Sequence, residues 1–280
     1  DSMQVYRRMD IGTAKPTPEE MRGIPHHMLD VADPEEDFSV ARYVELAAPC
    51  VDDILARGKL PIVAGGTGLY LDSLLSGRTF APFSPDGGLR ARLEARFDAL
   101  GGEAMLGELA AADPEAAARL HPNDRKRIVR ALEVFQQTGK TISQHNRETR
   151  ALPLRYDALT LSLAFQRRED MWARIDRRVD EMMAAGLAEE VRALLDSGVP
   201  ARCTAMQAIG YKELARALTQ GEDLAQAVEE VKRRSRQYAK RQLTWFRRDP
   251  NIEWILLEKE QDFSSVIQDS TNYLREKGLP

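Results

Sequence analysis

The chain has few cysteines, no long apolar run and no excess of positive charge. Cys50 and Cys203 are its two cysteines, and they lie far apart without metal-site spacing, so we expect buried thiols in a reducing cytosol. No apolar run approaches the roughly 18 residues of a membrane-spanning helix and no signal-peptide pattern occurs, so neither insertion nor export is expected. A net charge of −4 provides no global positive field, so any RNA site must be a local patch.

Length and composition indicate a globular protein with a sizeable core. Of 280 residues, 43% are hydrophobic and 30% are charged, enough for one large domain or two modest ones. Short apolar runs predict strands at residues 26–31, 60–64, 158–165 and 251–257. Helical periodicity predicts helices at residues 39–57, 69–75, 89–100, 103–112, 114–120, 122–138, 167–185, 187–197, 204–218, 222–248 and 264–277.

Residues 84–150 show helical patterns and no strand pattern, although strands are predicted on both sides of them. A segment rich in Gly, Pro and Ser, residues 77–88, marks the first junction. The sequence therefore predicts an α/β fold with a core of residues 1–83 and 151–280, containing a parallel sheet. Residues 84–150 are predicted to form an all-α insertion domain.

The opening residues, DSMQVYRRMDIGTAKP, combine an acid with groups that can bind an anion. Asp1 and Ser2 place a carboxylate beside a hydroxyl. The turn at residues 12–16 can present backbone donors, the Thr13 hydroxyl and the Lys15 ammonium. This pattern outlines a transfer site, and an ordinary polar surface loop is the alternative.

A glycine turn, Gly65-Gly66-Thr67-Gly68, follows the predicted strand at 60–64 and precedes a predicted helix. Glycines let backbone N–H groups approach an anion, and the helix N-terminus adds a positive end. Open α/β sheets bind ligands at the carboxyl ends of their strands, where this turn lies. A tight turn without a ligand is the alternative.

Two further helices carry clustered cations. Residues 121–134 contain four cations within six positions, with Arg127 and Arg130 as neighbours on one face. Arg174 and Arg178 are four residues apart and can converge on one anion, and arginine suits bidentate binding of diphosphate oxygens. A solvated face is the alternative for the first cluster. For the second it is pairing with the nearby acids, which are Glu169, Asp176, Asp180 and Glu181.

The predicted helix at 222–248 carries a cationic stripe. Its two columns consist of Arg233, Lys240 and Arg247, and of Arg234, Arg241 and Arg248. These cations span a sector roughly 140° wide and roughly 22 Å long. Apolar residues on the other side, Val231, Tyr238, Trp245 and Phe246, are expected to dock the helix. No acid interrupts the sequence between Lys232 and Arg248, so the stripe predicts contact with a nucleic-acid backbone. A solvated face is again the alternative.

With these segments identified, the chain resembles the tRNA dimethylallyltransferase family, also called tRNA isopentenyltransferases. The resemblance runs through the opening segment, GGTGLY, HPNDRKRIVRALEVFQQTGKT, RIDRRVDEMMAAGLAEEV, AIGYKEL and RQYAKRQLTWFRR. These motifs cover nearly the whole chain and keep the same order. The family transfers a dimethylallyl group from its diphosphate to the exocyclic amine of the adenine on the 3′ side of the anticodon.

The resemblance implies a role for particular residues and partners. Asp1 resembles the general base, Thr67 the hydroxyl that orients the adenine, and Arg178 the arginine that binds diphosphate. Residues that match tRNA-holding regions are Ser2, Met3, Gln4, Arg90, Lys126, Arg127, Ile128, Val129, Arg130, Gln207, Ala208, Ile209, Gly210, Tyr211 and Lys212. Thr13, Lys15, Gly65 and Gly66 are the expected anion-binding residues. A P-loop NTPase-like core, Mg²⁺ as cofactor, a tRNA anticodon stem-loop and dimethylallyl diphosphate as partners, and a monomer in the cytoplasm are also expected.

One departure from the family concerns its phosphate-binding loop. The family carries a GxxxxGK[ST] loop before the Asp-Ser motif, and this sequence contains no such loop. The Lys, backbone donors and metal-binding hydroxyl that such a loop supplies are therefore missing, and no metal-ligand set is identifiable. We expect an N-terminally truncated sequence, and a polypeptide that binds tRNA but transfers the prenyl group poorly.

Three rival functions fit parts of the pattern. A P-loop nucleotide kinase with an inserted lid shares the predicted core, and a non-catalytic RNA-binding module would make Asp1 and Thr67 incidental. A prenyltransferase acting on free adenine nucleotides is the nearest competitor. The basic helix at 222–248 argues against it, because a mononucleotide has no use for so long a stripe.

Overall fold

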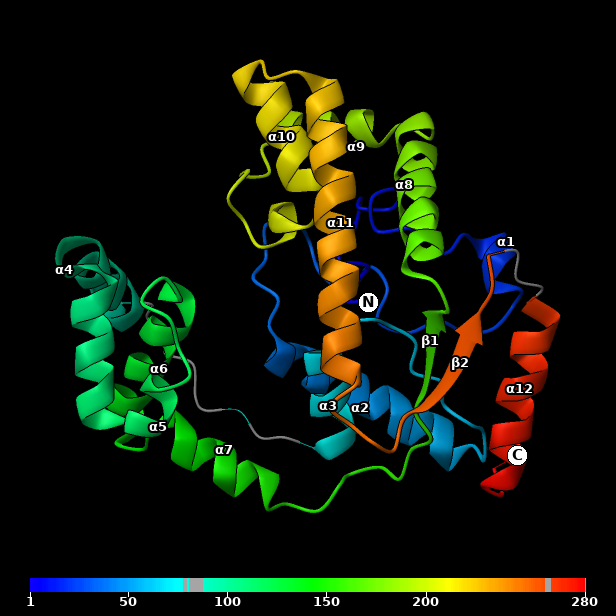
Figure 1. Cartoon of the computed structure of the whole chain (residues 1–280), viewed down its shortest axis with the longest axis horizontal. Coiled ribbons are helices and arrows are strands. Elements are labelled where there is room, and N and C mark those ends of the chain that lie inside the picture. Colours follow the sequence, from blue (N-terminus) through cyan, green and yellow to red (C-terminus); the bar gives the residue numbers. More distant parts are fainter. Residues whose placement is uncertain (78–79, 81–87, 260–262, 280) are drawn as a thin grey trace. The chain divides into compact units, whose positions relative to one another are not determined.

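The computed structural model describes residues 1–77, 80, 88–259 and 263–279, and the chain forms two compact units (Figure 1). The first unit is Asp1–Leu74 with Asp157–Pro280, and the second is Leu75–Tyr156. The first predicted boundary, at 83/84, lies outside the described residues. The second was predicted at 150/151, and the division into compact units falls after Tyr156. No described helix is long and apolar enough to cross a membrane.

The sheet of the first unit consists of two parallel strands, β1 (Leu161–Phe165) and β2 (Glu253–Leu257). Their register places Leu163 opposite Ile255. The final helix, α12 (Phe263–Glu276), packs against them through Val266, which forms a small core with Ile255 and Leu257 (Figure 1). The predicted α/β class with a parallel sheet is therefore confirmed.

Two of the four predicted strands are wrong. Residues 26–31 and 60–64 are described and form no strand, although a single parallel bridge joins Tyr6 to Ala32. Ile62 is 83% exposed. A strand exists only when a neighbouring backbone pairs with it, and the described chain forms no ladder with residues 60–64. An apolar run alone does not supply that neighbour.

Joined by irregular segments such as residues 57–67, the other regular elements of the first unit are helices. They are α1 (Pro18–Met21), α2 (Val40–Ala56), α3 (Gly68–Ser76), α8 (Arg168–Ala184), α9 (Leu187–Asp196), the short 3₁₀ helix η1 (Ala205–Gln207), α10 (Tyr211–Gln220) and α11 (Leu224–Phe246). The long helix α11 packs against α8 and α10 (Figure 1). The predicted continuous helix at 204–218 is wrong, because Gly210 has φ +98 and separates η1 from α10.

The second unit is all-helical in its described part: α4 (Gly88–Ala112), α5 (Pro114–Ala117), α6 (Arg125–Thr138) and α7 (Ile142–Arg150). Its core includes Leu93, Leu109, Ile128 and Leu132. The helices predicted at 89–100 and 103–112 are joined in α4 by a kink, where Gly101 has φ +80. The left-handed conformation suits glycine and bends the chain so that both halves reach one core.

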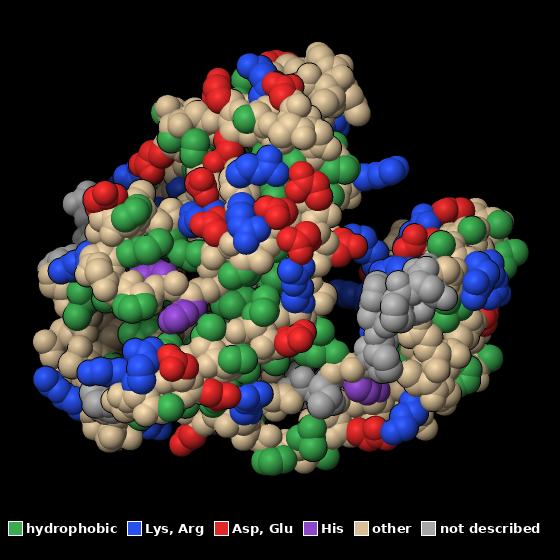
Figure 2. Space-filling view, turned by 180° about the vertical axis from the view of Figure 1, so that it is seen from behind, with side chains coloured by type: hydrophobic (Ala, Val, Ile, Leu, Met, Phe, Trp, Pro, Cys, Tyr) green, Lys and Arg blue, Asp and Glu red, His purple; other side chains and the backbone are tan. Residues whose placement is uncertain are grey.

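Acidic and basic side chains are interspersed over the face drawn in Figure 2 rather than gathered into one field. This agrees with the small net charge of −4. An RNA footprint on such a surface must come from a few cations that lack acidic partners.

Candidate functional site

The glycine turn and the opening residues lie side by side, although they are far apart in the sequence. The Thr67 hydroxyl donates a hydrogen bond to the Ser2 hydroxyl, with 3.0 Å between the oxygens. A Cβ placed on Gly65 would lie 3.5 Å from the Asp1 nitrogen. The structure thus brings together two segments that sequence reasoning had assigned separately to one site.

The exposed side chain of Asp1 is oriented by its own backbone. Its Oδ1 accepts a hydrogen bond from the Met3 N–H at 2.8 Å. Such a turn restrains the carboxylate while leaving it accessible to a ligand. Thr67 lies directly before α3, and its carbonyl accepts the Tyr70 N–H at 2.9 Å, which fixes the start of that helix. Both functional groups are therefore held by local structure.

The anion-binding groups of the turn at 12–16 are occupied within the protein. The Thr13 hydroxyl donates to the Met9 carbonyl at 2.6 Å. The Lys15 side chain is 6% exposed, and its ammonium binds the carboxylates of Asp10 and Asp30 and a backbone carbonyl. The geometry favours a structural role for Thr13 and Lys15 over the expected contact with diphosphate.

The backbone donors of the same segment bind a carboxylate from α9. Glu190 accepts hydrogen bonds from the N–H groups of Asp10, Ile11 and Gly12 at 2.8, 2.8 and 3.2 Å, and from the Tyr211 hydroxyl. Burial, followed by the charge of Glu190 and its hydrogen bond, raises the pKa of Tyr211 well above its usual range. The backbone donors of this turn thus bind the Glu190 carboxylate of the same chain in place of a ligand anion. Sequence reasoning missed Glu190, since nothing local marks a partner so distant in the chain.

The predicted RNA-binding segment at 207–212 is largely interior. Ala208, Gly210 and Tyr211 are buried, and Ile209 is half-buried. Only Gln207 and Lys212 expose their side chains, so these two are the members of the segment able to touch a large ligand. Near the N-terminus, the Gln4 side chain donates to the Thr13 and Ala14 carbonyls at 3.0 and 2.9 Å, which holds the turn at 12–16.

Arg178 on α8 is exposed and is not paired with the nearby acids. Asp176 binds Arg236 at 2.6 Å, and Asp180 binds Lys232 at 2.7 Å. Both acids therefore face α11, and no described residue forms an ion pair with Arg178. Its guanidinium is available for an anionic ligand, as the expected diphosphate role requires.

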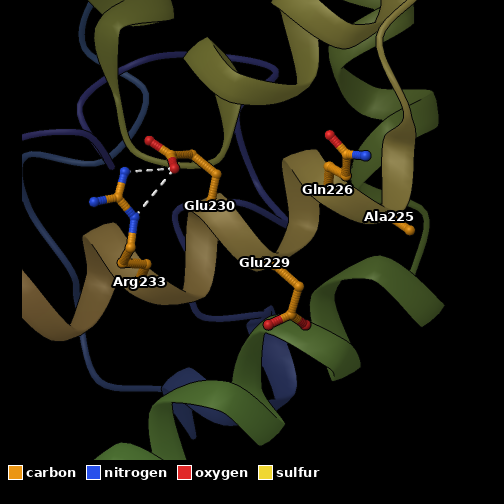
Figure 3. A pocket seen from close by; sticks show the side chains of 5 residues that line it. All are labelled: Ala225, Gln226, Glu229, Glu230 and Arg233. Carbon is orange, nitrogen blue, oxygen red and sulfur yellow. Dashed lines mark hydrogen bonds and ion pairs between the residues drawn. The ribbon is translucent and has the colours of Figure 1, made fainter.

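The cations of α11 differ along the helix, contrary to the uniform stripe expected from sequence. Arg233 binds Glu230 at 2.6 Å and lines an open pocket (Figure 3), and Arg234 binds both Glu230 and the buried Glu213. The pocket has a volume of about 390 Å³ and is lined by Ala225, Gln226, Glu229, Glu230 and Arg233. The acids that were absent from this stretch of the sequence thus come from one helical turn earlier and from α10. The N-terminal part of the stripe is neutralised.

The C-terminal part of α11 keeps its positive charge. Lys240, Arg241, Arg247 and Arg248 are exposed, and none forms an ion pair with a described residue. Arg241 stacks over Tyr238 at 5.5 Å and Arg248 over Trp245 at 5.2 Å, contacts that leave their N–H donors available. These four residues, the α11 cation group, form a local patch suited to phosphates.

The expected RNA contacts of the second unit divide into interior and surface residues. Ile128 and Val129 are fully buried, whereas Lys126 and Arg127 are exposed. Sequence reasoning did not single out Glu133, a buried acid of this cluster. Its carboxylate, 0% exposed, binds Arg130 at 2.7 Å and lies 3.8 Å from Arg90, whose nearer partner is Glu94 at 3.3 Å.

A test of this arrangement replaces Glu133 with Gln. The variant keeps the shape of the side chain and removes the charge that binds Arg130, so we expect tRNA affinity to fall about tenfold. The rate at saturating tRNA should stay unchanged. Filter binding and single-turnover assays measure the two quantities, with Glu148→Gln, an exposed acid of α7, as control. Unchanged affinity would show that Glu133 serves the fold alone.

No group of three or more His, Cys, Asp or Glu side chains that could hold a metal ion occurs among the described residues. The side chains of the described residues therefore do not fit an ion held by the protein alone. A Mg²⁺ bound to substrate phosphates needs only one or two protein oxygens, so the expected cofactor stays a prediction.

Comparisons with known proteins cover nearly the whole chain. A family profile described as IPP transferase matches residues 4–249. The tRNA dimethylallyltransferase 1 of Trichlorobacter lovleyi is 50% identical over 255 residues, which is 91% of this chain and 83% of that relative. The tRNA dimethylallyltransferase of Geobacter sulfurreducens is 48% identical over 266 residues, covering 95% of this chain and 84% of the relative.

Solved structures agree with the sequence relatives. The full-length tRNA isopentenylpyrophosphate transferase from Bacillus halodurans is 42% identical with a TM-score of 0.71, covering 99% of this chain and 86% of that one. A eukaryotic dimethylallyltransferase acting on tRNA is 30% identical with a TM-score of 0.79, covering 100% of this chain and 72% of that one. With the ordered motifs, the parallel-stranded α/β fold and these matches together, the chain belongs to the IPP transferase family of tRNA-prenylating enzymes.

Proposed function

We propose that this protein transfers a dimethylallyl group from dimethylallyl diphosphate to the exocyclic amine of the adenine 3′ of the anticodon in tRNA. One observation carries the proposal. The hydrogen bond between Thr67 and Ser2 joins the acid-bearing segment to the glycine turn, in a chain of this family. The relatives' names state the same substrate class.

Asp1 is the proposed general base. An aromatic amine is a poor nucleophile, so a carboxylate that takes its proton as the new bond forms accelerates attack. The amine nitrogen bonds to the first carbon of the prenyl group, the bond from that carbon to the diphosphate oxygen breaks, and the proton passes to Asp1. The Thr67 hydroxyl is the proposed hydrogen-bonding group that orients the adenine, and its contact with Ser2 beside Asp1 supports this role.

Arg178 is the proposed ligand of the diphosphate. Negative charge accumulates on this leaving group as its bond breaks, and a guanidinium stabilises that charge in the transition state. A divalent ion, Mg²⁺ by expectation, would supply further charge neutralisation when bound to the diphosphate. The exposed guanidinium of Arg178, which forms no ion pair with a described residue, supports its part in this role.

The anticodon stem-loop of tRNA is the proposed macromolecular partner. The α11 cation group offers contacts to the phosphate backbone. The target adenine is stacked within a loop, so it must leave the stack to reach Asp1 and Thr67. A monomer in the cytoplasm remains the expectation for the assembly and its location.

One assay separates this function from its rivals. A version of the protein that carries a GxxxxGK[ST] loop is mixed with labelled dimethylallyl diphosphate and either tRNA or AMP, and in parallel with labelled ATP alone. Label transferred to tRNA supports the proposal. Transfer to AMP instead indicates a nucleotide prenyltransferase, and ATP turnover without prenyl transfer indicates a kinase.

Replacing Arg178 with Ala should raise the KM for dimethylallyl diphosphate by at least about tenfold and lower the transfer rate, because a charge-assisted hydrogen bond to the diphosphate strengthens in the transition state. Arg192→Ala, an exposed arginine of α9, is the control. Steady-state kinetics and tRNA binding measure the outcome. A loss of tRNA affinity with a normal KM for the diphosphate would reassign Arg178 to the RNA.

A further inference from the structure

We propose that Gln242 and Trp245 on α11 are positioning residues that fix the glycine turn and, through it, the Thr67 hydroxyl. The inference rests on the proposed role of Thr67 in orienting the adenine. It assigns to α11 a second task besides contact with RNA.

Gln242 holds the residue before Thr67. Its Nε2 donates a hydrogen bond to the Gly66 carbonyl at 2.9 Å. That carbonyl belongs to the planar peptide unit that links Gly66 to Thr67, so a fixed oxygen also fixes the direction in which the Thr67 backbone leaves the turn. A Cβ on Gly66 would lie 2.0 Å from the same Nε2, so an alanine at this position would push the flexible end of Gln242 away from the carbonyl.

Trp245 holds the residues after Thr67. A Cβ on Gly68 would lie 2.2 Å from the indole Cδ1, so the backbone of α3 begins directly against the ring. The indole Nε1 donates to the Asp72 carboxylate at 3.1 Å, one turn further along α3. Thr67 is therefore flanked by two glycines, and each lies against one side chain of α11.

The residues that hold the turn share a short stretch of α11 with its cation group. At about 100° per residue, Lys240 and Arg247 point away from Gln242 and Trp245, whereas Arg241 and Arg248 lie between these two directions, and Arg248 stacks over the Trp245 ring. A phosphate backbone bound by this cation group thereby restrains the helix that also holds the turn around Thr67. The placement of the hydroxyl and the engagement of RNA are linked through one rigid element.

The hydrogen bond from Gln242 predicts a specific pattern in variants. Gln242→Ala should lower the single-turnover rate at saturating tRNA by about 10- to 100-fold and leave tRNA affinity within about twofold. Gln242→Glu keeps the shape but replaces the donor with an acceptor facing a carbonyl, so it should be slower than Gln242→Ala. If Gln242 served only to fill space, Gln242→Glu would transfer faster than Gln242→Ala, because it keeps the volume of the side chain.

A double-variant experiment tests the geometry directly. Gly66→Ala should be impaired about as much as Gln242→Ala, because its methyl group displaces the Gln242 amide from the Gly66 carbonyl. If that displacement is the cause, the double variant Gly66→Ala/Gln242→Ala should have the same rate as Gln242→Ala alone. Multiplied defects in the double variant would mean that the two sites act independently, and would overturn the inference.

Amide hydrogen exchange in the free protein gives a readout that does not depend on catalysis. Gln242→Ala should accelerate exchange at residues 67–71, whereas Gln237→Ala, an exposed glutamine of α11, should not. Unchanged exchange in Gln242→Ala overturns the inference. Faster exchange with an unchanged transfer rate upholds the hydrogen bond but removes the proposed role of Thr67, so the two failures are distinguishable.

Discussion

Replacing Asp1 with Asn is expected to lower the rate of prenyl transfer by about 10²- to 10⁴-fold while leaving tRNA affinity within about twofold. The amide has nearly the same shape and can still accept the Met3 N–H, so the turn that holds residue 1 survives. The variant no longer has a carboxylate able to take the proton of the attacking amine. A general base acts in the chemical step, so its loss lowers the transfer rate. The affinity for tRNA depends on other residues and should therefore stay nearly unchanged.

The experiment uses single-turnover transfer at saturating tRNA, together with direct binding. It is best done in a version of the enzyme that carries a GxxxxGK[ST] loop, because this sequence contains no such motif. Asp196→Asn, an exposed acid at the end of α9, serves as control. Normal turnover combined with a large loss of tRNA affinity would contradict the base and make Asp1 an RNA contact.

The second large effect concerns the α11 cation group. The double variant Arg241→Gln/Arg248→Gln should weaken tRNA binding and flatten its dependence on salt. Each phosphate that the protein no longer neutralises reduces the slope of log affinity against log salt by about 0.7–0.9, so the two changes together should reduce it by up to about 1.8. Equilibrium titrations at several salt concentrations measure this slope.

A matched control lies earlier on the same helix. Arg233 already binds Glu230, and Glu230 keeps Arg234 as a partner when Arg233 is removed. Arg233→Gln should therefore leave the salt slope nearly unchanged. Equal slopes for the wild type and the double variant would show that the C-terminal cations of α11 are an ordinary solvated face.

Local patterns in the sequence predicted the helices well and the strands poorly. Helices close their hydrogen bonds within one segment, so periodicity and glycine punctuation located α2, α6, α9 and α11 within a few residues. A strand depends on a distant neighbour. The run at 60–64 has the composition of a strand, but its backbone has no strand partner in the described chain.

The residues of the candidate site likewise fall into two groups, those that local sequence motifs reveal and those that depend on contacts distant in the chain. Asp1, Thr67 and Arg178 belong to motifs that the sequence displays, whereas Glu190 and Gln242 act on segments 179 and 176 residues away. No local periodicity encodes such pairings. The charge of α11 was misjudged for the same reason, because part of its neutralisation comes from Glu213 on α10.

The Glu190 carboxylate accepts hydrogen bonds from three backbone N–H groups, and this determines which positions of the segment tolerate substitution. Every residue except proline carries a backbone N–H, so substitutions at Ile11 other than proline leave this interaction intact. Gly12 is the exception, because a Cβ there would lie 2.5 Å from the Tyr211 ring. We therefore expect the segment to tolerate mutation at position 11 while permitting almost none at Gly12 or at Glu190, a pattern that a saturation library of this region would display.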